Sequence, residues 1–558
     1  MTAPNDDGFL QDPPQLANTY RADGPLRRIL ARRLAAGTFE AIAPDLDRLG
    51  ALAAGPMAAL AREAERDAPR HVPFDAWGRR IDALELAPAW AELLAIAARE
   101  GIVAEAYERR FGAASRLVQM ARLYLYHPSS AIASCPLAMS DGAARVLELH
   151  GTPQQRARVL PRLIARDATQ AWTSGQWMTE RSGGSDVSTT ETMAHPAPDG
   201  GWELSGVKWF SSATSAEVAL ALARIAGDPP GNRGLSLFLV ELEGQVGRTI
   251  RILRLKDKLG TRALPTAELE LAGCRAELVG KRGRGVATVA TMLNVTRYYN
   301  TVCAAGYLAR GLQLARDYAA RRRAFGETLA TLPLHAATLA DLACEHAGAL
   351  ELAAECAALV GREELGEASA EERARLRLLT PVAKLLTARQ AVAGAAEAIE
   401  SFGGAGYVET TGLPALARDA QVLPIWEGTT NVLALDALRA IEREGALGPF
   451  VEDTARRLAA AALGLDAAGR ETLESALRAA VTWHRSASGD RARLEAGARD
   501  VALALGRVLE GVLLAESAAA SGSQEAGELA ARFAARSVPA LRGERPFAET
   551  ARLAIPPG

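Results

Sequence analysis

The sequence predicts an α+β protein in which a compact β domain is inserted between long helical regions. Apolar residues recur at spacings of three and four from about residue 25 to 165, and again from Val286 onward, which is typical of helices. Between them, from about 170 to 278, the chain has short alternating or apolar segments separated by "PAPDGG" and "DPPGNRG". Strands never alternate singly with helices, which argues against a doubly wound parallel sheet.

Four domains are expected in order. Residues 1–168 form an N-terminal helical domain, exemplified by "AWAELLAIAAREGIVAEAYERRF". Residues 169–280 form an antiparallel, β-barrel-like domain with strands such as "WELSGVKWF", "LSLFLVELE" and "TIRILRL". Residues 281–440 form a four-helix bundle, with helices from Val286, at about 335–362 and 372–402, and from about 431. Residues 441–558 form a helical C-terminal extension interrupted by "SGSQ".

The composition is that of an ordinary cytoplasmic protein. The 64 Lys and Arg residues are balanced by 66 Asp and Glu residues, so no basic excess points to nucleic acid or to an anionic membrane. The five cysteines are widely spaced and form no CxxC pair, which favours a reducing compartment. The N-terminus lacks the pattern of a signal peptide, charged residues interrupt every apolar stretch, and no metal site is expected.

Two short motifs have two interpretations each. The glycines of "FGGAGY", residues 402–407, follow a long helix rather than a strand, so locally a helix-ending turn is favoured over a phosphate-binding loop. In "PIWEGTTN", residues 424–431, Glu427 stands beside Trp426 and Ile425, and partial desolvation would raise its pKa toward that of a general base. The alternative is a surface acid ahead of a helix that Thr429 or Thr430 caps.

Several segments taken together resemble the acyl-CoA dehydrogenase superfamily. They occur in the order "MTERSGGSD" (178–186), "GVKWFSS" (206–212), "KDKLGTR" (256–262), "GKRGRGV" (280–286), "RRAFG" (322–326), "FGGAGY" (402–407) and "IWEGTTN" (425–431). With "CPLAMS" (135–140) and the helical extension, the chain is most similar to the AidB-like branch, which is associated with the alkylation response. The resemblance implies the acyl-CoA dehydrogenase-like fold and an FAD bound without a Rossmann domain.

The resemblance assigns cofactor contacts to particular residues. Backbone groups near Met178 and the Thr179 hydroxyl would reach the flavin ring, and Ser185 would lie near the phosphates, although a capped Gly-rich turn explains the same loop. Phe210 and Ser212 stand where much of the family has Trp and Thr beside the flavin, and Phe210 is alternatively a core residue of the β domain.

A second set of contacts would come from a neighbouring subunit. Arg322 and Phe325 match the contacts that the family makes to FAD across the subunit boundary, since a guanidinium suits a pyrophosphate. Gly403 and Gly404 would approach the same pyrophosphate, and Thr429 is a further expected cofactor contact. The resemblance implies a homo-oligomer, and a tetramer is expected.

The implied reaction is α,β-dehydrogenation of an acyl-CoA to a trans-2-enoyl thioester. Glu427 is the candidate base, because the residue before Arg297, where some branches carry the base, is Thr296 and cannot serve. Arg297 would tune the charge of the base, or else be a structural ion-pairing residue. The expected electron acceptor is an electron-transfer flavoprotein.

Two other functions are compatible with the sequence. The AidB-like resemblance allows a flavoprotein that binds DNA through its C-terminal domain, but the arginines there are matched by acids. They include Arg456, Arg457, Arg491, Arg493, Arg499, Arg536, Arg542 and Arg545. An oxidase or a dehydrogenase acting on an acyl carrier protein would share the same flavin environment, and the sequence leaves acyl chain length open.

Overall fold

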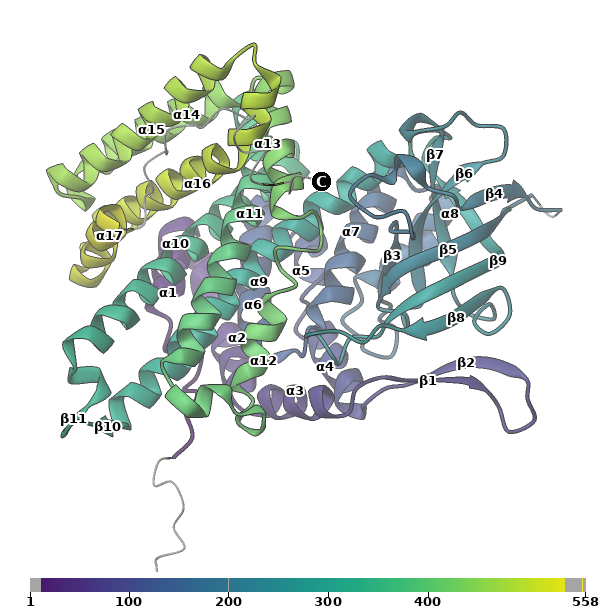
Figure 1. The fold of residues 1–558 in the computed structure, drawn as a ribbon, viewed down its shortest axis with the longest axis horizontal. Helices are drawn as coiled ribbons and strands as arrows, with labels where there is room; N and C mark the ends of the chain where they lie inside the picture. Colours follow the sequence, from purple (N-terminus) through teal and green to yellow (C-terminus); the bar gives the residue numbers. More distant parts are fainter. Residues whose placement is uncertain (1–11, 199, 537–553, 555–558) are drawn as a thin grey trace, which may run out of the picture.

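A computed structural model describes residues 12–198, 200–536 and 554, and the chain is arranged as four consecutive parts (Figure 1). Long helices of the bundle occupy the centre, the β domain lies on one side, and the C-terminal extension lies on the other. No helix in the described ranges is both long enough and apolar enough to span a bilayer. Nor do those ranges contain a cluster of three His, Cys, Asp or Glu side chains suited to a metal.

The N-terminal part is helical, as predicted, except for one hairpin. Its helices are α1 (Gly24–Arg33), α2 (Ala36–Ala54), α3 (Pro56–Arg66), α4 (Pro88–Arg99), α5 (Ala104–Glu108), α6 (Ser115–Tyr126), α7 (Ser134–His150) and α8 (Pro153–Leu163). The expectation of helix throughout was wrong at β1 (Arg70–Phe74) and β2 (Arg80–Glu85), an antiparallel pair that projects below the β domain (Figure 1). The buried Asp82 carboxylate accepts from the Ile252 N–H at 3.1 Å, so a tertiary contact holds this hairpin.

The β domain is a seven-stranded sheet that is mostly antiparallel. Its strands are β3 (Ser174–Trp177), β4 (Met193–Pro196), β5 (Trp202–Ser212), β6 (Val218–Ile225), β7 (Leu235–Glu241), β8 (Ile250–Leu255) and β9 (Thr266–Val279). The predicted antiparallel pattern is broken at β6, which pairs in parallel with β3 and β4. These parallel pairings are possible because long connections separate β6 from both partners along the chain.

The bundle contains the four predicted helices and one more. They are α9 (Gly285–Arg321), α10 (Pro333–Glu364), α11 (Ala370–Glu400) and α13 (Thr430–Glu444), with the short α12 (Leu413–Ala420) before the last. A short hairpin follows α9, with strands β10 (Arg323–Ala324) and β11 (Glu327–Thr328) of two residues each. Helix α9 packs against α7, α10 and α11, so it passes through the middle of the molecule.

The C-terminal extension is helical, as predicted, and packs across the bundle. It consists of α14 (Leu447–Ala460), α15 (Ala467–Ala487), α16 (Arg491–Ser521) and α17 (Gln524–Arg536). Helix α16 lies against α10, α11 and α13. The Arg457 guanidinium joins the two parts, since it bonds Glu355 of α10 at 2.8 Å and Glu516 of α16 at 2.6 Å. The extension is therefore tied to the bundle by buried charge as well as by apolar packing.

Candidate functional site

Glu427 lies in a tight turn that leads into α13. Its φ is +57°, in the left-handed region that non-glycine residues rarely adopt, and Gly428 follows with a φ of +103°. A left-handed conformation costs a non-glycine residue about 1–3 kcal/mol, and it persists only where the surroundings impose it. Thr429 occupies the N-cap position, but its side chain makes no capping hydrogen bond. The turn is therefore held by something other than the expected threonine cap.

The Glu427 carboxylate is enclosed by groups from three other elements. The Thr296 hydroxyl of α9 donates to it at 2.5 Å, and the Gln176 amide of β3 lies beside it. Burial raises the pKa of Glu427, and Thr296, Arg297, Lys384 and Gln176 partly oppose that rise by stabilising the carboxylate. The residue nevertheless keeps part of its surface accessible. A half-accessible acid with a raised pKa is suited to exchange protons with a bound ligand.

Arg297 hydrogen-bonds the backbone carbonyl of Glu427 rather than its carboxylate. Its Nε donates to the Glu427 carbonyl oxygen at 3.2 Å, while its Nη1 bonds Asp436 of α13 at 2.8 Å. Asp436 is shared with Arg377 of α11, again at 2.8 Å. The two interpretations of Arg297 therefore hold together, because one guanidinium forms a structural ion pair and also contacts the turn of the candidate base.

The loop of residues 178–186 is anchored beneath the same site. The Glu180 carboxylate accepts from the buried Lys208 ammonium at 2.7 Å and from the Thr192 hydroxyl at 2.5 Å. The Thr179 carbonyl accepts from the Trp209 N–H at 2.9 Å, which places the loop against β5. Gln176 also contacts the Met178 sulfur at 3.3 Å, so Met178 and Glu427 share one neighbour.

The end of β5 presents an aromatic ring and a hydroxyl next to this loop. Phe210 is 56% exposed, and the Lys256 ammonium lies 4.7 Å from its ring centroid, so Phe210 does not belong to the core of the β domain. The Ser212 hydroxyl hydrogen-bonds Thr266 at 3.1 Å. Ser185 is exposed at the turn of the 178–186 loop.

The remaining predicted residues lie at the other end of the bundle. Arg322 directly follows α9, and Arg321, its last residue, is about 36 Å from Arg297 at 1.5 Å per helical residue. Phe325 stands at the tip of the β10–β11 hairpin and is 96% exposed. Gly403 is at the same end, because the adjacent Phe402 ring packs on Tyr318 of α9 at 4.8 Å. One chain therefore does not unite Arg322, Phe325, Gly403 and Gly404 with Glu427.

Three residues of the site were missed by the sequence analysis or dismissed by it. Thr296 was considered only as a residue that cannot act as a base, whereas its hydroxyl donates a hydrogen bond to Glu427, the candidate base. Gln176 carried no sequence signal. Lys384 did carry one, because it is a lone charge within the apolar stretch "LLTPVAKLLTA", which is unusual for a fully buried helix face.

Two side chains close to Glu427 in space or in sequence carry buried polar atoms that a bound group could satisfy. The Gln176 Oε1 and the Trp426 Nε1 are buried without a hydrogen-bond partner in the described structure. The backbone N–H groups of Glu427, Gly428 and Thr429 likewise donate to no acceptor in that part of the chain. Because buried polar groups are almost always satisfied, the two buried side-chain atoms point to a bound partner of matching polarity, whereas the three N–H groups stand at a partly exposed helix start.

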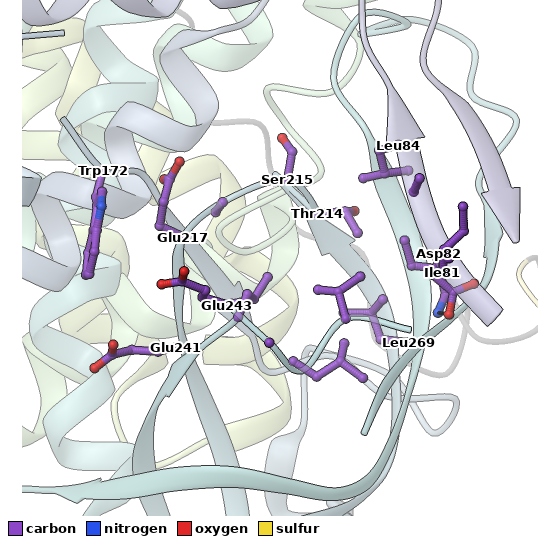
Figure 2. Close-up of a pocket in the computed structure, with 17 residues that line it drawn as sticks. Ile81, Asp82, Leu84, Trp172, Thr214, Ser215, Glu217, Glu241, Glu243 and Leu269 are labelled. Carbon is purple, nitrogen blue, oxygen red and sulfur yellow. Dashed lines mark hydrogen bonds between the residues drawn. The ribbon is translucent and has the colours of Figure 1, made fainter. Parts of the chain in front are cut away.

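A separate cavity of about 470 Å³ lies between the β1–β2 hairpin and the sheet (Figure 2). Leu84, Ile81 and Leu269 form its apolar side, whereas Glu217, Glu241 and Glu243 lie toward Trp172. None of the site residues expected from the sequence is among its described lining residues. The two sites lie at different positions along β3. Thr173, just before the strand, bonds Glu217 of the cavity, whereas Gln176 within the strand contacts Glu427, the candidate base.

Family models match nearly the whole chain. They are the AidB N-terminal domain over residues 11–168, the acyl-CoA dehydrogenase middle domain over 175–274, its C-terminal domain over 283–442, and the acyl-CoA dehydrogenase 11 C-terminal domain-like model over 446–543. The acyl-CoA dehydrogenase family member 11 of Caenorhabditis elegans is 42% identical over 547 residues, which cover 94% of this chain and 88% of that protein. This chain belongs to the acyl-CoA dehydrogenase family.

Two further comparisons place it within the AidB-like branch. The putative acyl-CoA dehydrogenase AidB of Escherichia coli is 31% identical over 439 residues, covering 77% of this chain and 79% of its own. The crystal structure of Caenorhabditis elegans ACDH-11 in complex with C11-CoA superimposes with a TM-score of 0.93 at 41% identity, covering 97% of this chain and 95% of that chain. The predicted family and fold, including the additional helical extension of this acyl-CoA dehydrogenase, are confirmed.

Proposed function

We propose that this acyl-CoA dehydrogenase family member oxidises an acyl thioester to its trans-2-enoyl thioester, with Glu427 as the base and FAD as the cofactor. The observation that carries the proposal is the Glu427 carboxylate itself. Burial raises its pKa, and the Thr296 hydroxyl donates a hydrogen bond to it. The residue lies in a left-handed turn whose backbone N–H groups have no acceptor within the described residues.

Glu427 removes the proton from the α carbon of the thioester. A base of raised pKa is matched to this step, because the proton must be accepted near neutral pH and released again after product forms. The Glu427 backbone N–H binds the thioester oxygen, on which negative charge develops as the proton leaves. FAD, when bound, accepts the β hydrogen as hydride. The chain's own contribution is therefore to position the substrate, to hold the base and to stabilise the developing charge.

The cofactor contacts divide between two subunits. Met178, Thr179, Phe210, Ser212 and Thr429 hold the flavin end, and Ser185 lies toward the phosphates. The neighbouring subunit contributes Arg322, Phe325, Gly403 and Gly404. The distance of about 36 Å along α9 supports this division, since a single chain cannot bring both groups to one flavin. This division requires a homo-oligomer, for which we propose the tetramer expected from the family resemblance.

The substrate is an acyl-CoA. The complex of the related ACDH-11 with C11-CoA supports this choice and favours a medium-length chain as the first to test. An electron-transfer flavoprotein is the proposed electron acceptor. The five cysteines are buried and free, which suits the reducing conditions of the cytoplasm.

The DNA-binding hypothesis has less support. Arg456 and Arg457 of α14 pair with acids, as does Arg491 of α16 with Glu495 at 2.7 Å. Arginines that are neutralised within the fold contribute little to phosphate binding. Arg542 and Arg545 lie outside the described residues.

The test is anaerobic bleaching of the purified, FAD-loaded protein by short, branched, medium and long acyl-CoAs. Rapid loss of the flavin absorbance near 450 nm with one chain class is the expected result, since reduced flavin does not absorb there. An oxidised flavin after every thioester, including carrier-protein thioesters, would contradict the proposed reaction.

A further inference from the structure

The turn that carries Glu427 is held by two cations on two successive carbonyl groups. Arg297 of α9 donates to the Glu427 carbonyl at 3.2 Å, and Lys384 of α11 donates to the Gly428 carbonyl at 2.7 Å. The two side chains come from different helices of the bundle. The Glu427–Gly428 peptide and the Gly428–Thr429 peptide are therefore each held by one cation.

Lys384 is unusual because it is fully buried without a carboxylate partner. Its exposed fraction is 0%, and within the described ranges no acid lies at ion-pair distance from its ammonium. Burial lowers the pKa of Lys384 to about 7, opposed by the negative charge of Glu427 and reinforced by the positive charge of Arg297. A buried lysine is normally paired, because removing its charge from water is costly. The single carbonyl contact does not repay that cost, so stability alone does not explain the residue.

The contact with Gly428 controls the direction of the next peptide plane. In a trans peptide the C=O and the following N–H point to opposite sides. Because Lys384 binds the Gly428 carbonyl, the Thr429 N–H points away from α11. The same reasoning directs the Gly428 N–H away from Arg297. Both N–H groups lack an acceptor in the described structure, so the two cations orient donors that remain available to a ligand.

Lys384 also supplies charge to the base without touching it. Its ammonium stabilises the ionised Glu427 carboxylate from a distance at which no direct bond forms. The charged groups that act on Lys384 are Glu427, in the turn before α13, and Arg297, on α9. A neutral side chain at position 384 would therefore change both the shape of the turn and the proton affinity of the base.

We propose that Lys384 is a positioning residue for Glu427, which keeps the 427–429 turn in its left-handed conformation and holds the carboxylate in its ionised, substrate-facing state. The proposal rests on the proposed function of Glu427 as the base. It assigns Lys384 a role in the reaction although the residue touches neither the carboxylate nor the solvent.

The test compares Lys384→Met with Arg507→Met in FAD-loaded protein. Arg507 is a partly buried cation of α16 that pairs with Glu345 and Glu510, away from the turn, so its loss controls for removing positive charge from the helical core. For each variant, single-turnover flavin reduction by the best acyl-CoA is measured per bound flavin from pH 6 to pH 10, and the crystal structure is determined.

The expected result for Lys384→Met is a reduction rate at least about 10-fold below wild type, with the apparent substrate affinity changed far less. The acid limb of its pH profile moves to higher pH, because the carboxylate loses a stabilising cation. In the crystal, the Gly428 carbonyl rotates away from position 384. Arg507→Met is expected to lower thermal stability while its rate and acid limb stay at wild-type values.

An unchanged rate, acid limb and turn in Lys384→Met would overturn the proposal. If that variant does not fold, Lys384→Gln, which is uncharged and one bond shorter, is judged by the same three measurements. If no thioester reduces the wild-type flavin, the proposed function fails. The crystal structures would still decide whether Lys384 sets the conformation of the turn, so the two failures are distinguishable.

Discussion

The Thr296 hydroxyl lies 2.5 Å from a carboxylate oxygen of Glu427, although 131 positions separate the two residues in the chain. The hydroxyl oxygen also lies 3.2 Å from the carbonyl oxygen of Leu293, three residues earlier in α9, a contact that is common for threonine in a helix. The bond to Glu427 therefore uses a side chain that the helix already holds in place.

Thr296→Val removes this hydrogen bond and keeps the shape of the side chain. The bond lowers the pKa of Glu427, so its loss raises that pKa further. The acid limb of flavin reduction should move to higher pH, with little change on the alkaline plateau. Thr301→Val is the control, since that hydroxyl bonds only the Arg297 carbonyl.

Glu427→Gln should leave FAD bound and slow flavin reduction by acyl-CoA about 10²–10⁴-fold, because Gln keeps the size of the side chain and cannot accept the proton. Stopped-flow reduction under anaerobic conditions measures the rate, and the visible spectrum measures the bound flavin. Reduction at the wild-type rate would remove Glu427 as the base.

Arg322→Ala should reduce FAD occupancy even though Arg322 is far from Glu427 in its own chain. If Arg322 serves the neighbouring subunit, hybrid oligomers of Arg322→Ala and Glu427→Gln chains contain some sites with an intact base and an intact arginine. Mixed refolding or co-expression should then restore activity that neither parent has. Hybrids as inactive as both parents would mean that Arg322 serves its own chain.

Glu180→Gln should lower both flavin retention and thermal stability, because it leaves the buried Lys208 without its counter-charge. Breaking a buried pair from one side costs about 3–5 kcal/mol. Burial tends to raise the pKa of Glu180, but Lys208 and the other donors bring it below its usual value. The stabilisation is therefore present above the ordinary carboxyl pKa and is lost as the pH falls through the folded-state pKa.

The control for Glu180→Gln is Glu270→Gln, which removes one partner of the half-exposed pair with Arg251. Pairs of that kind contribute about 0–1 kcal/mol. Differential scanning calorimetry with and without added FAD separates the two variants. Equal melting temperatures in the two would show that the 178–186 loop does not depend on Glu180.

Glu510 should make the attachment of the extension sensitive to alkaline pH. Burial between α16 and α10 raises the pKa of Glu510 to about 8, although Arg507 opposes the shift. The folded chain therefore holds a proton that the unfolded chain releases above its ordinary pKa, so stability falls as the pH rises toward 8. The melting temperature of wild type should drop between pH 6 and pH 9, and that of Glu510→Gln should drop less.

The family motifs allowed the flavin-facing residues and the base to be proposed from the sequence, because each occupies a short stretch with a characteristic composition, and these assignments stay predictions. The β1–β2 hairpin was not predictable in the same way. In the stretch "RHVPFDAWGRRIDALE", the hairpin is held by the bond from the Ile252 N–H to Asp82, a contact between residues far apart in the sequence. The parallel pairings of β6 were missed for a related reason, since strand patterns reveal pairing partners only between neighbours in the chain.

The partners of Glu427 were hidden because they come from separate elements. Gln176, Thr296 and Lys384 stand on a strand and two helices, and nothing in their local sequence relates them to "PIWEGTTN". Arg297 was found because the family pattern includes it. The pKa direction of Glu427 was anticipated from Trp426 and Ile425, yet Ile425 is 61% exposed, so the desolvation arises mainly from the fold around the turn.

Helix α9 runs without interruption from Thr296, beside the proposed base, to Arg321, beside the residue that we propose serves a neighbouring subunit. The length of α9 therefore sets the distance between the two sites in each subunit of the proposed oligomer. One inserted residue would turn one end against the other by about 100° and lengthen the helix by about 1.5 Å, which would misalign the proposed base with the residues proposed to serve the next subunit. We therefore expect α9 to tolerate substitutions during evolution more readily than insertions or deletions.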